Sequence, residues 1–387
     1  MSSAPETTPT GDSGRGRDDA VPHPWTRTVT GYVITVASGS LDRVEAIARA
    51  SASAHRYAII TDDTVRRLYV ERVVAQFGSA SVTVLSVSPG EAHKTRESWA
   101  RLTDDLLSAG HGRDSAIIAL GGGVVGDLAG FVAATYMRGV PFVQVPTTLL
   151  AMLDASVGGK TAVDTPAGKN LVGAFHRPAA VIVDPAVLGT LPARELRGGL
   201  AEAIKHGMIA DAAYLDRIRH SLAMLLGAEG HRSRPMADVI TRSIEIKSDV
   251  VEADEREAGR RRILNFGHTL GHAIEALSGY TLLHGEAVAI GMALEAELAE
   301  RAGIAGRGTA AGLREVLRNA DLPTERPRSI DADRVLELAR GDKKTRAGVI
   351  EMALPLAVGR MAGEDRGWTV DVGEDLIREV IEERAGP

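Results

Sequence analysis

The alternation of strand-like and helix-like segments in the first half of the chain is the feature that most constrains its fold. From Tyr32 to about Pro192, short runs rich in β-branched residues alternate with segments of helical periodicity. The pattern predicts strands at 32–37, 56–61, 81–87, 115–120, 141–145 and 180–183, and helices at 41–54, 97–109 and 127–137. Such alternation is typical of a parallel sheet with helices packed on its faces.

The second half has a different pattern, because strand-like runs almost disappear after Pro192. Helical periodicity predicts helices at 195–210, 213–226, 234–253, 262–278, 285–302, 309–320 and 374–384, with one strand at 349–354. We therefore predict an α/β domain at 29–191 and an all-helical domain at 192–387, with a binding site in the cleft between them. Residues 1–28, rich in Ser, Thr, Pro and Gly, are expected to form a disordered extension.

Composition excludes several kinds of site and partner. The 387 residues contain no Cys, so disulfides, thiolate metal sites and cysteine nucleophiles are excluded, and His and carboxylates remain as metal ligands. The net charge of −6 and the dispersed cations give no indication of nucleic-acid binding. No apolar run reaches the length of a membrane span, and the first residues lack the apolar core of a signal peptide. We expect a cytoplasmic protein that binds neither nucleic acid nor membrane.

A glycine-rich turn at 121–127 follows an apolar strand and opens a helix. Gly121, Gly123 and Gly126 have the spacing of a dinucleotide-binding turn, in which a pyrophosphate lies at the helix N-terminus. That spacing also occurs in tight structural turns, which is the alternative interpretation. No acidic residue ends the next strand, so Asp62, at the end of an earlier strand, is the better candidate to bind ribose hydroxyls.

A polar stripe is predicted on the helix at 262–278. Steps of four, three and four residues place Arg261, Asn265, His268 and His272 on one face. The other faces are apolar, so the helix is expected to be buried, and its polar stripe then needs anionic or metal partners. The alternative is a surface helix with two ordinary histidines. Gly267 and Gly271 beside the stripe indicate close approach by another backbone or a ligand.

Further polar residues could complete a site. Glu202 and Lys205 lie three apart on a predicted helix, which alone indicates an ordinary ion pair. Together with His268 and His284, Glu202 becomes the third ligand of a His₂Glu set, the pattern of a catalytic zinc with an open position. The glycine-rich stretches 154–160 and 168–170 are expected to be loops whose lysines and amide suit a phosphate or carboxylate, or else ordinary solvated loops.

Taken together, these motifs closely resemble the 3-dehydroquinate synthases of the sugar phosphate cyclase family, over roughly residues 32–359. The resemblance implies a Rossmann-like NAD-binding α/β domain, a helical metal-binding domain and a homodimer. It implies NAD and Zn²⁺ (or Co²⁺) as cofactors. The reaction it implies converts 3-deoxy-D-arabino-heptulosonate 7-phosphate into 3-dehydroquinate and phosphate, by transient oxidation, phosphate elimination, re-reduction and an intramolecular aldol step.

The resemblance also assigns residues to roles. The implied metal ligands are Glu202, His268 and His284. The implied NAD contacts are Asp62, Glu91, Lys94, Gly122, Gly123, Val124, Asp127, Thr147, Thr148, Leu150, Asp154, Lys160, Lys169, Thr190 and Leu191. The implied catalytic and substrate contacts are Asp154, Lys160, Asn170, Lys205, Lys247, Arg261, Asn265, His272 and Lys343, with Arg138 reaching across a dimer interface. His206 and Thr64 stand where the family commonly has Tyr and Asn.

Within this family, the implied carboxylate clamp decides the expected substrate. Lys247, Arg261 and Lys343 would hold a carboxylate, which favours a 2-keto acid over a neutral sugar phosphate. An aminodehydroquinate synthase or another sugar phosphate cyclase is the alternative. An NAD- and metal-dependent polyol dehydrogenase, which would release NADH, is the alternative from a different class of enzyme.

Overall fold

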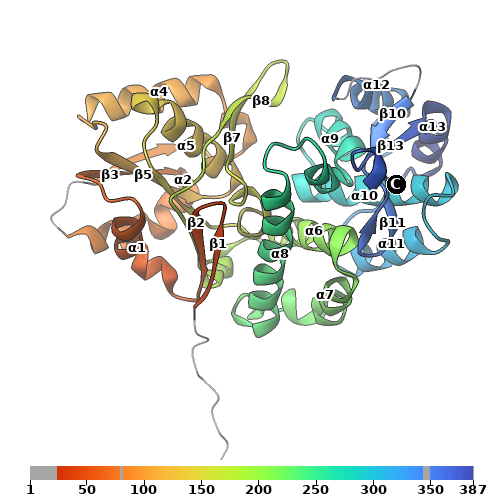
Figure 1. The fold of residues 1–387 in the computed structure, drawn as a ribbon, viewed down its shortest axis with the longest axis horizontal. Coiled ribbons are helices and arrows are strands. Elements are labelled where there is room, and N and C mark those ends of the chain that lie inside the picture. The colour runs from red at the N-terminus through yellow and green to blue at the C-terminus, as the bar shows by residue number, and fades with distance from the viewer. Residues whose placement is uncertain (1–23, 79–81, 343–348, 387) are drawn as a thin grey trace, which may run out of the picture.

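The computed structural model describes residues 24–78, 82–342 and 349–386. An α/β half lies beside a mainly helical half, shown from red to yellow and from green to blue in Figure 1. The first half contains a seven-stranded sheet in the order β1-β2-β9-β6-β5-β3-β4. Its strands are β1 Trp25–Val29, β2 Tyr32–Val36, β3 Arg56–Asp62, β4 Val82–Val87, β5 Ser115–Gly121, β6 Phe142–Pro146 and β9 Ala180–Val183.

The predicted parallel α/β architecture is confirmed. All neighbouring strands of the sheet run parallel except β1 and β2. Every residue of β5 and β9 is buried, as expected for strands covered on both faces. The main helices of this half are α1 Val44–Ser51, α4 Arg96–Ser108 and α5 Gly123–Thr135.

Two sequence-based expectations for this half were wrong in part. The extension predicted at 1–28 is too long, because Trp25–Val29 pairs antiparallel with β2 at the edge of the sheet; residues 1–23 lie outside the described part. The predicted loop at 168–170 is part of a strand, whereas the loop predicted at 154–160 is confirmed for residues 156–159 and lies between two regular elements. Strand β7 Lys160–Thr165 pairs antiparallel with β8 Gly168–Phe175, and η6 Ala151–Ala155 forms a helical turn. The polar and glycine residues around Lys160 and at 168–170 did not indicate this hairpin.

The second half is helical, as predicted, with small two-stranded ribbons. Its helices are α6 Ala193–Ala210, α7 Ala212–Leu225, α8 Arg234–Ala253, α9 His268–Leu277, α10 His284–Arg301, α11 Thr309–Asn319, α12 Ala332–Asp342 and α13 Glu374–Glu383. Its ribbons pair β10 Val349–Met352 with β13 Val370–Gly373, and β11 Pro355–Ala357 with β12 Arg360–Met361. The sequence analysis missed α12. Among the described helices, none is long and apolar enough to cross a membrane.

The continuous helix predicted at 262–278 is wrong. The segment contains a 3₁₀ helix, η9 Arg260–Asn265, then a break at Phe266 and Gly267, then α9. Gly267 has φ of 81°, a left-handed conformation that ends one helix and starts the next. Arg261 and Asn265 therefore do not share a helical stripe with His268 and His272, and only tertiary packing can bring the four together.

Gly267, which caps α9, and Gly271 within α9 allow close packing of two backbones, which is one of the two uses predicted for them. A Cβ on Gly267 would lie 2.4 Å from Cγ of Met292, and one on Gly271 would lie 3.0 Å from the carbonyl of Ala287. A Cβ on Gly291 in α10 would lie 1.9 Å from the carbonyl oxygen of Gly267. Helices α9 and α10 are thus in backbone contact, which fixes their first residues relative to one another.

One apolar core joins the two halves. Val145 and Ile182 of the sheet belong to the same buried cluster as Leu200 of α6 and Ile244 of α8. The turn η6, which follows β6, packs against α5, α6 and α8. The loop after a central strand is therefore held directly against the helices that carry Glu202 and Lys247.

Candidate active site

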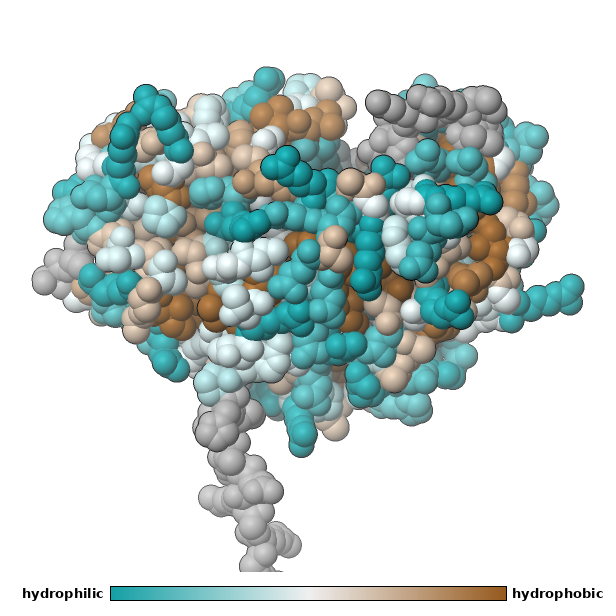
Figure 2. Space-filling model, in the orientation of Figure 1, coloured by the Kyte–Doolittle hydropathy of each residue, from teal (hydrophilic) through white to brown (hydrophobic). Residues whose placement is uncertain are grey.

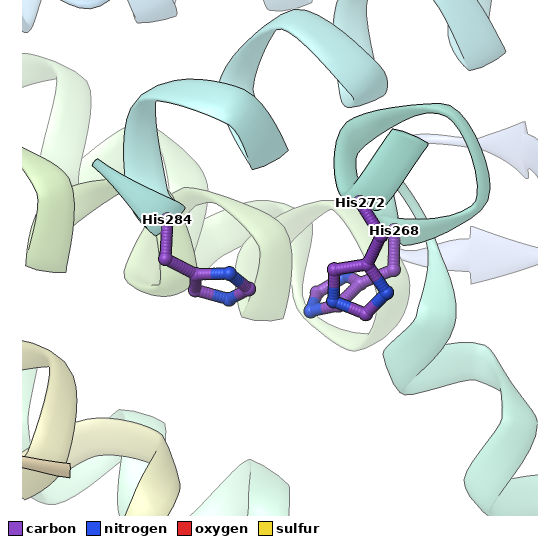
Figure 3. Close-up of side chains that lie close together, drawn as sticks. All are labelled: His268, His272 and His284. Atoms are coloured by element: carbon purple, nitrogen blue, oxygen red, sulfur yellow. The ribbon is translucent and has the colours of Figure 1, made fainter. Parts of the chain in front are cut away.

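Glu202, His268 and His284 meet in the structure although they come from three different helices. Glu202 lies in the middle of α6, and the histidines are the first residues of α9 and α10. Oε1 of Glu202 lies 3.7 Å from Nε2 of His268 and 3.7 Å from Nε2 of His284. Figure 3 shows the imidazoles of His268 and His272 together, facing that of His284.

The second nitrogen of each histidine is already engaged. Nδ1 of His268 lies 3.2 Å from the carbonyl of Phe266, and Nδ1 of His284 lies 3.1 Å from Oε2 of Glu275. These acceptors hold a proton on each Nδ1 and leave the Nε2 atoms directed at Glu202.

The gap between the three ligand atoms fits a divalent cation. A separation of 3.7 Å is too long for a hydrogen bond, and Oε1 of the fully buried Glu202 has no hydrogen-bond partner among the described residues. A zinc ion would stand about 2.0–2.2 Å from each ligand. Burial lowers the pKa of His268 well below its ordinary value. Burial also lowers the pKa of His284, but Glu202 and Glu275 outweigh this and raise it to about 9.

His272 lies on the solvent side of this cluster. Its ring packs edge-on against His268, with centroids 4.9 Å apart, and its ring nitrogen comes within 4.8 Å of those of His268 and His284. It is exposed, in contrast to the buried Glu202. This position suits contact with a bound substrate, the role implied for it by the sequence.

A neighbouring acidic group does not need a metal. Asp154, Glu202 and His206 have ligand atoms within 4.8 Å of one another. However, Nζ of Lys205 lies 2.5 Å from Oε2 of Glu202, and Nζ of Lys247 lies 2.6 Å from Oδ1 of Asp154. The two ammonium groups already balance the two carboxylates, so lysines occupy this side of the site and the metal position lies between Glu202 and the histidines.

Three buried cations lie on the side of Glu202 and Asp154. The exposed fractions of Lys205, Lys247 and Arg261 are 1%, 6% and 2%. Burial lowers the pKa of Lys247 to about 8, against the opposing effect of Asp154. Burial also lowers the pKa of Arg261, and its nearby charge further lowers that of Lys247. A Cβ on Gly158 would lie 2.5 Å from Nη2 of Arg261, so only glycine leaves room for the guanidinium. Two buried cations so close together favour binding of an anion.

The structure identifies Glu257, which the sequence analysis missed. Nδ2 of Asn265 donates to its Oε1 at 2.7 Å, and Nζ of Lys160 forms an ion pair with its Oε2. Lys160 and Asn265, both implied substrate contacts, are thus joined by a carboxylate. Lys160 is 97 residues away in the chain, so no local spacing could reveal this contact.

A second charged cluster contains several of the implied NAD contacts. Nζ of the buried Lys94 lies 2.7 Å from Oε1 of Glu91, 3.4 Å from Oδ2 of Asp127 and 2.9 Å from Oδ1 of Asn170. Asn170, one of the implied substrate contacts, thus has its side-chain oxygen on Lys94. Burial raises the pKa of Asp127 to about 6, only partly offset by Lys94.

Lys169 links this charged cluster to the metal ligands. Its Nζ lies 3.4 Å from Oε1 of Glu91 and 2.7 Å from Oε1 of Glu275, whose other oxygen contacts His284. Glu275 was also missed by the sequence analysis. It lies two helical turns after His268 on α9, and the continuing i, i+4, i+7 pattern is a signal that could have found it.

The glycine-rich turn is tightly packed. A Cβ on Gly121 would lie 2.6 Å from Cβ of Val125, and one on Gly122 would lie 3.1 Å from Cγ2 of Thr148. The structural alternative therefore accounts for these two glycines. The turn still opens α5 with Gly122 as a cap that offers no side chain, so the first amide N–H groups of α5 are available to a phosphate.

Other implied contacts have visible local roles. Oδ1 of Asp62 accepts from the amides of Thr64 and Val65, at 2.8 and 3.0 Å, and so caps α2 Asp63–Val65. Oγ1 of Thr190 lies 2.6 Å from the hydroxyl of Tyr69. Arg138 is exposed after α5. The remaining implied NAD contacts follow β5, β6 and β9 at one edge of the sheet: Gly123, Val124, Thr147, Thr148, Leu150 and Leu191. Lys343 lies outside the described residues.

Comparisons with known proteins agree with this geometry. A family model for the N-terminal region of 3-dehydroquinate synthase matches residues 84–198, and one for the C-terminal region matches 199–345. The 3-dehydroquinate synthase of Symbiobacterium thermophilum is 44% identical over 351 residues, which cover 90% of this chain and 96% of that protein. The enzyme of that name from Pelobacter propionicus is 47% identical over 307 residues, covering 79% of this chain and 84% of that protein.

Solved structures with a similar fold include other cyclases. A 2-deoxy-scyllo-inosose synthase complexed with carbaglucose-6-phosphate, NAD⁺ and Co²⁺ has a TM-score of 0.83 at 28% identity, covering 93% of this chain and all of the other. A 2-epi-5-epi-valiolone synthase from Streptomyces hygroscopicus with NAD⁺ and Zn²⁺ has a TM-score of 0.82 at 31% identity, covering 92% and 97% of the two chains. A probable glycerol dehydrogenase from Sinorhizobium meliloti, at 18% identity and a TM-score of 0.61, shares the fold alone.

Proposed function

Because the chain belongs to the 3-dehydroquinate synthase family, we propose that it converts 3-deoxy-D-arabino-heptulosonate 7-phosphate into 3-dehydroquinate and phosphate. The observation that carries the proposal is the convergence of Glu202, His268 and His284 beside the buried cations Lys205, Lys247 and Arg261. A phosphorylated keto acid has oxygens for a metal and two anionic groups for the cations.

We also propose NAD and one divalent cation, Zn²⁺ or Co²⁺, as cofactors. Support comes from the cyclase structures that hold NAD⁺ with Co²⁺ or Zn²⁺, and from the unpartnered Oε1 of Glu202 facing two imidazole nitrogens. When bound, NAD would accept and return a hydride and the cation would polarise the reacting oxygen. Glu202, His268 and His284 would hold the cation. The N-terminus of α5 and the cluster around Lys94 would face the dinucleotide.

The remaining residues would orient the substrate. Lys247 and Arg261 would hold its carboxylate, with Asp154 keeping the ammonium of Lys247 in place. Lys205 would contact the substrate beside Glu202. For Lys160 and Asn265 to bind the phosphate, they must exchange the carboxylate of Glu257 for a phosphate oxygen. A charge-assisted contact is thereby replaced by another of the same kind.

The carboxylate clamp favours the keto acid over other cyclase substrates. Lys247 and Arg261 are buried and lie close enough for the Arg261 charge to lower the pKa of Lys247. Burying two such cations costs free energy unless an anion accompanies them. Asp154 supplies negative charge to Lys247, and Glu257, Asp154 and Asp254 supply it to Arg261. A substrate carboxylate would add a charge-assisted partner for both cations.

A homodimer is proposed as the working form. Apolar side chains project from the β7–β8 hairpin, where Leu171, Val172 and Phe175 are 63%, 38% and 55% exposed. In Figure 2, apolar surface lies at the top of the molecule, where Figure 1 shows the hairpin. Exposed apolar patches mark interaction surfaces.

The test is a phosphate-release assay with purified protein, NAD and Zn²⁺, comparing the keto acid, its amino analogue, sedoheptulose 7-phosphate and glucose 6-phosphate. We expect phosphate release from the keto acid without accumulation of NADH. Preference for a neutral sugar phosphate would reassign the chain to another cyclase reaction. Stoichiometric NADH would indicate a dehydrogenase instead.

A further inference from the structure

Helix α9, which carries His268 and His272, begins without a local cap. Its N-cap residue is Gly267, which has no side chain to accept a hydrogen bond from the first turn. The first amide N–H groups of any α-helix lack partners within the helix and need an acceptor from elsewhere. The amide of the buried Leu270 cannot find its acceptor in bulk water.

The acceptor is the side chain of Glu295, which comes from the middle of α10. Its Oε2 accepts from the amide of Gly267 at 2.6 Å, and its Oε1 accepts from the amide of Leu270 at 3.1 Å. These are the N-cap and N3 amides of α9, the two donors that a capping box satisfies with two separate side chains. Here a single carboxylate, from another helix, accepts both hydrogen bonds.

Glu295 is 0% exposed. An ionised carboxylate in such a place is unfavourable unless its hydrogen bonds are satisfied, and a negative charge is stabilised at a helix N-terminus. The sequence of α10 is otherwise apolar around this position, with Met292, Leu294 and Leu298 all fully buried. An apolar residue would pack there without any desolvation penalty, so the carboxylate needs a reason beyond filling space.

His268 lies between the two anchored amides. It is the first residue of α9, directly after Gly267 and two residues before Leu270. Its own Nδ1 contacts the carbonyl of Phe266, on the other side of Gly267. The direction of its Nε2 is therefore set by the backbone from 266 to 270, and that backbone is held by Glu295 from one side.

We propose that Glu295 is a positioning residue for the metal centre, acting through the N-terminus of α9 to hold His268 toward Glu202 and His284. The inference rests on the proposed metal site. The affinity of that site would then depend on a carboxylate that is not itself one of the three ligands and that binds the amides of Gly267 and Leu270. Partners that hydrogen-bond a metal ligand directly change metal affinity about 10- to 100-fold when they are altered, and we expect an effect of the same order from a group that holds the backbone around a ligand.

The test compares Glu295→Gln and Glu295→Ala with Leu313→Ala in the full-length protein. Leu313 is 1% exposed on α11, which packs against α10, so its truncation weakens the helical half without removing the α9 cap. Titration with Co²⁺ against a chromophoric chelator gives the Kd, the visible spectrum of bound Co²⁺ reports its coordination, and thermal unfolding without metal gives Tm. NAD affinity serves as a second control.

We expect both Glu295 variants to bind Co²⁺ about 10- to 100-fold more weakly with a shifted spectrum. Leu313→Ala should have a lower Tm with wild-type Kd and spectrum, and NAD affinity should be unchanged in all three. A wild-type Kd and spectrum in Glu295→Gln would overturn the inference. So would an equal loss of Co²⁺ affinity in Leu313→Ala, because a general loss of stability would then explain it. If the wild type binds no Co²⁺, the proposed metal centre itself fails, and this inference fails with it.

Discussion

Oε2 of Glu275 lies 3.1 Å from Nδ1 of His284, joining the second helical turn of α9 to the first residue of α10. The other oxygen of Glu275 accepts from Lys169 at 2.7 Å, so the same carboxylate also contacts the β7–β8 hairpin. Glu275 therefore orients one implied metal ligand and ties it to a strand of the α/β half. Outer partners of this kind fix the tautomer and direction of a ligating histidine.

Replacing Glu275 with Gln should weaken divalent metal binding about 10- to 100-fold, because the neutral amide no longer holds the proton on Nδ1 of His284 as strongly. Competition with a chelator measures the change. Glu315→Gln, which breaks an exposed ion pair with Arg219, is the control and should bind metal like the wild type. Equal affinity in Glu275→Gln and the control would contradict the assignment of His284 as a ligand.

Lys247 should produce an alkaline limb in the pH profile of kcat/KM. Burial lowers its pKa to about 8, so the ammonium is present below that pH and is lost as the pH rises through it. Since only the ammonium attracts a substrate carboxylate, kcat/KM should fall tenfold per pH unit above about 8. In Lys247→Arg, whose side chain stays charged, the limb should move to higher pH whatever the absolute rate. If the alkaline limb is unchanged in Lys247→Arg, the limb belongs to another titrating group.

Arg261→Ala should lower kcat/KM on the keto acid by about two to four orders of magnitude. A buried charge left without its partner costs about 3–5 kcal/mol, and about 1.4 kcal/mol corresponds to tenfold. Lys cannot reproduce the planar fork, so Arg261→Lys should also lose most activity. The matched control is Arg262→Ala, since that neighbour is partly exposed and pairs only at 3.9 Å with Glu351. Metal and NAD binding should persist in both variants. Retained activity in Arg261→Ala would contradict the proposed carboxylate-binding role of Arg261.

Two glycine-to-alanine changes should have opposite effects on stability. A Cβ on Gly291 would lie 1.9 Å from the carbonyl of Gly267, so Gly291→Ala must separate α9 from α10 and should destabilise by about 1–3 kcal/mol or more. Gly312 lies within α11 with nothing within 4 Å of the added Cβ, and Gly312→Ala should stabilise by about 0.5–1 kcal/mol. Urea unfolding of both variants measures the difference. Destabilisation of the same size in both would show that the α9–α10 contact is not specific.

Much of the fold could be predicted from local pattern alone. Helix 234–253 was predicted with its observed ends, because Ser233 and the Pro after Arg234 are strong start signals and the apolar period continues to Ala253. The parallel strands were predicted because each is a short apolar run between turn residues. The β7–β8 hairpin was missed because neither strand shows the alternation of buried and exposed residues that marks a strand. Three central residues of β7 are buried in succession, and β8 contains two glycines and is mostly exposed.

The sequence by itself determined which chemical groups are available: a Cys-free chain with two histidines and a glutamate for a metal, and lysines and arginines for anions. It determined most element positions too, because helical and strand periods arise from contacts within a few residues. Only the tertiary structure decided which groups meet. The break at Gly267 removed Arg261 from the predicted stripe, and packing of α6, α9 and α10 brought Glu202 to two histidines. Glu257 and Glu295 acquire their partners across 97 and 28 residues of chain, where burial and backbone packing, not sequence spacing, set the contact.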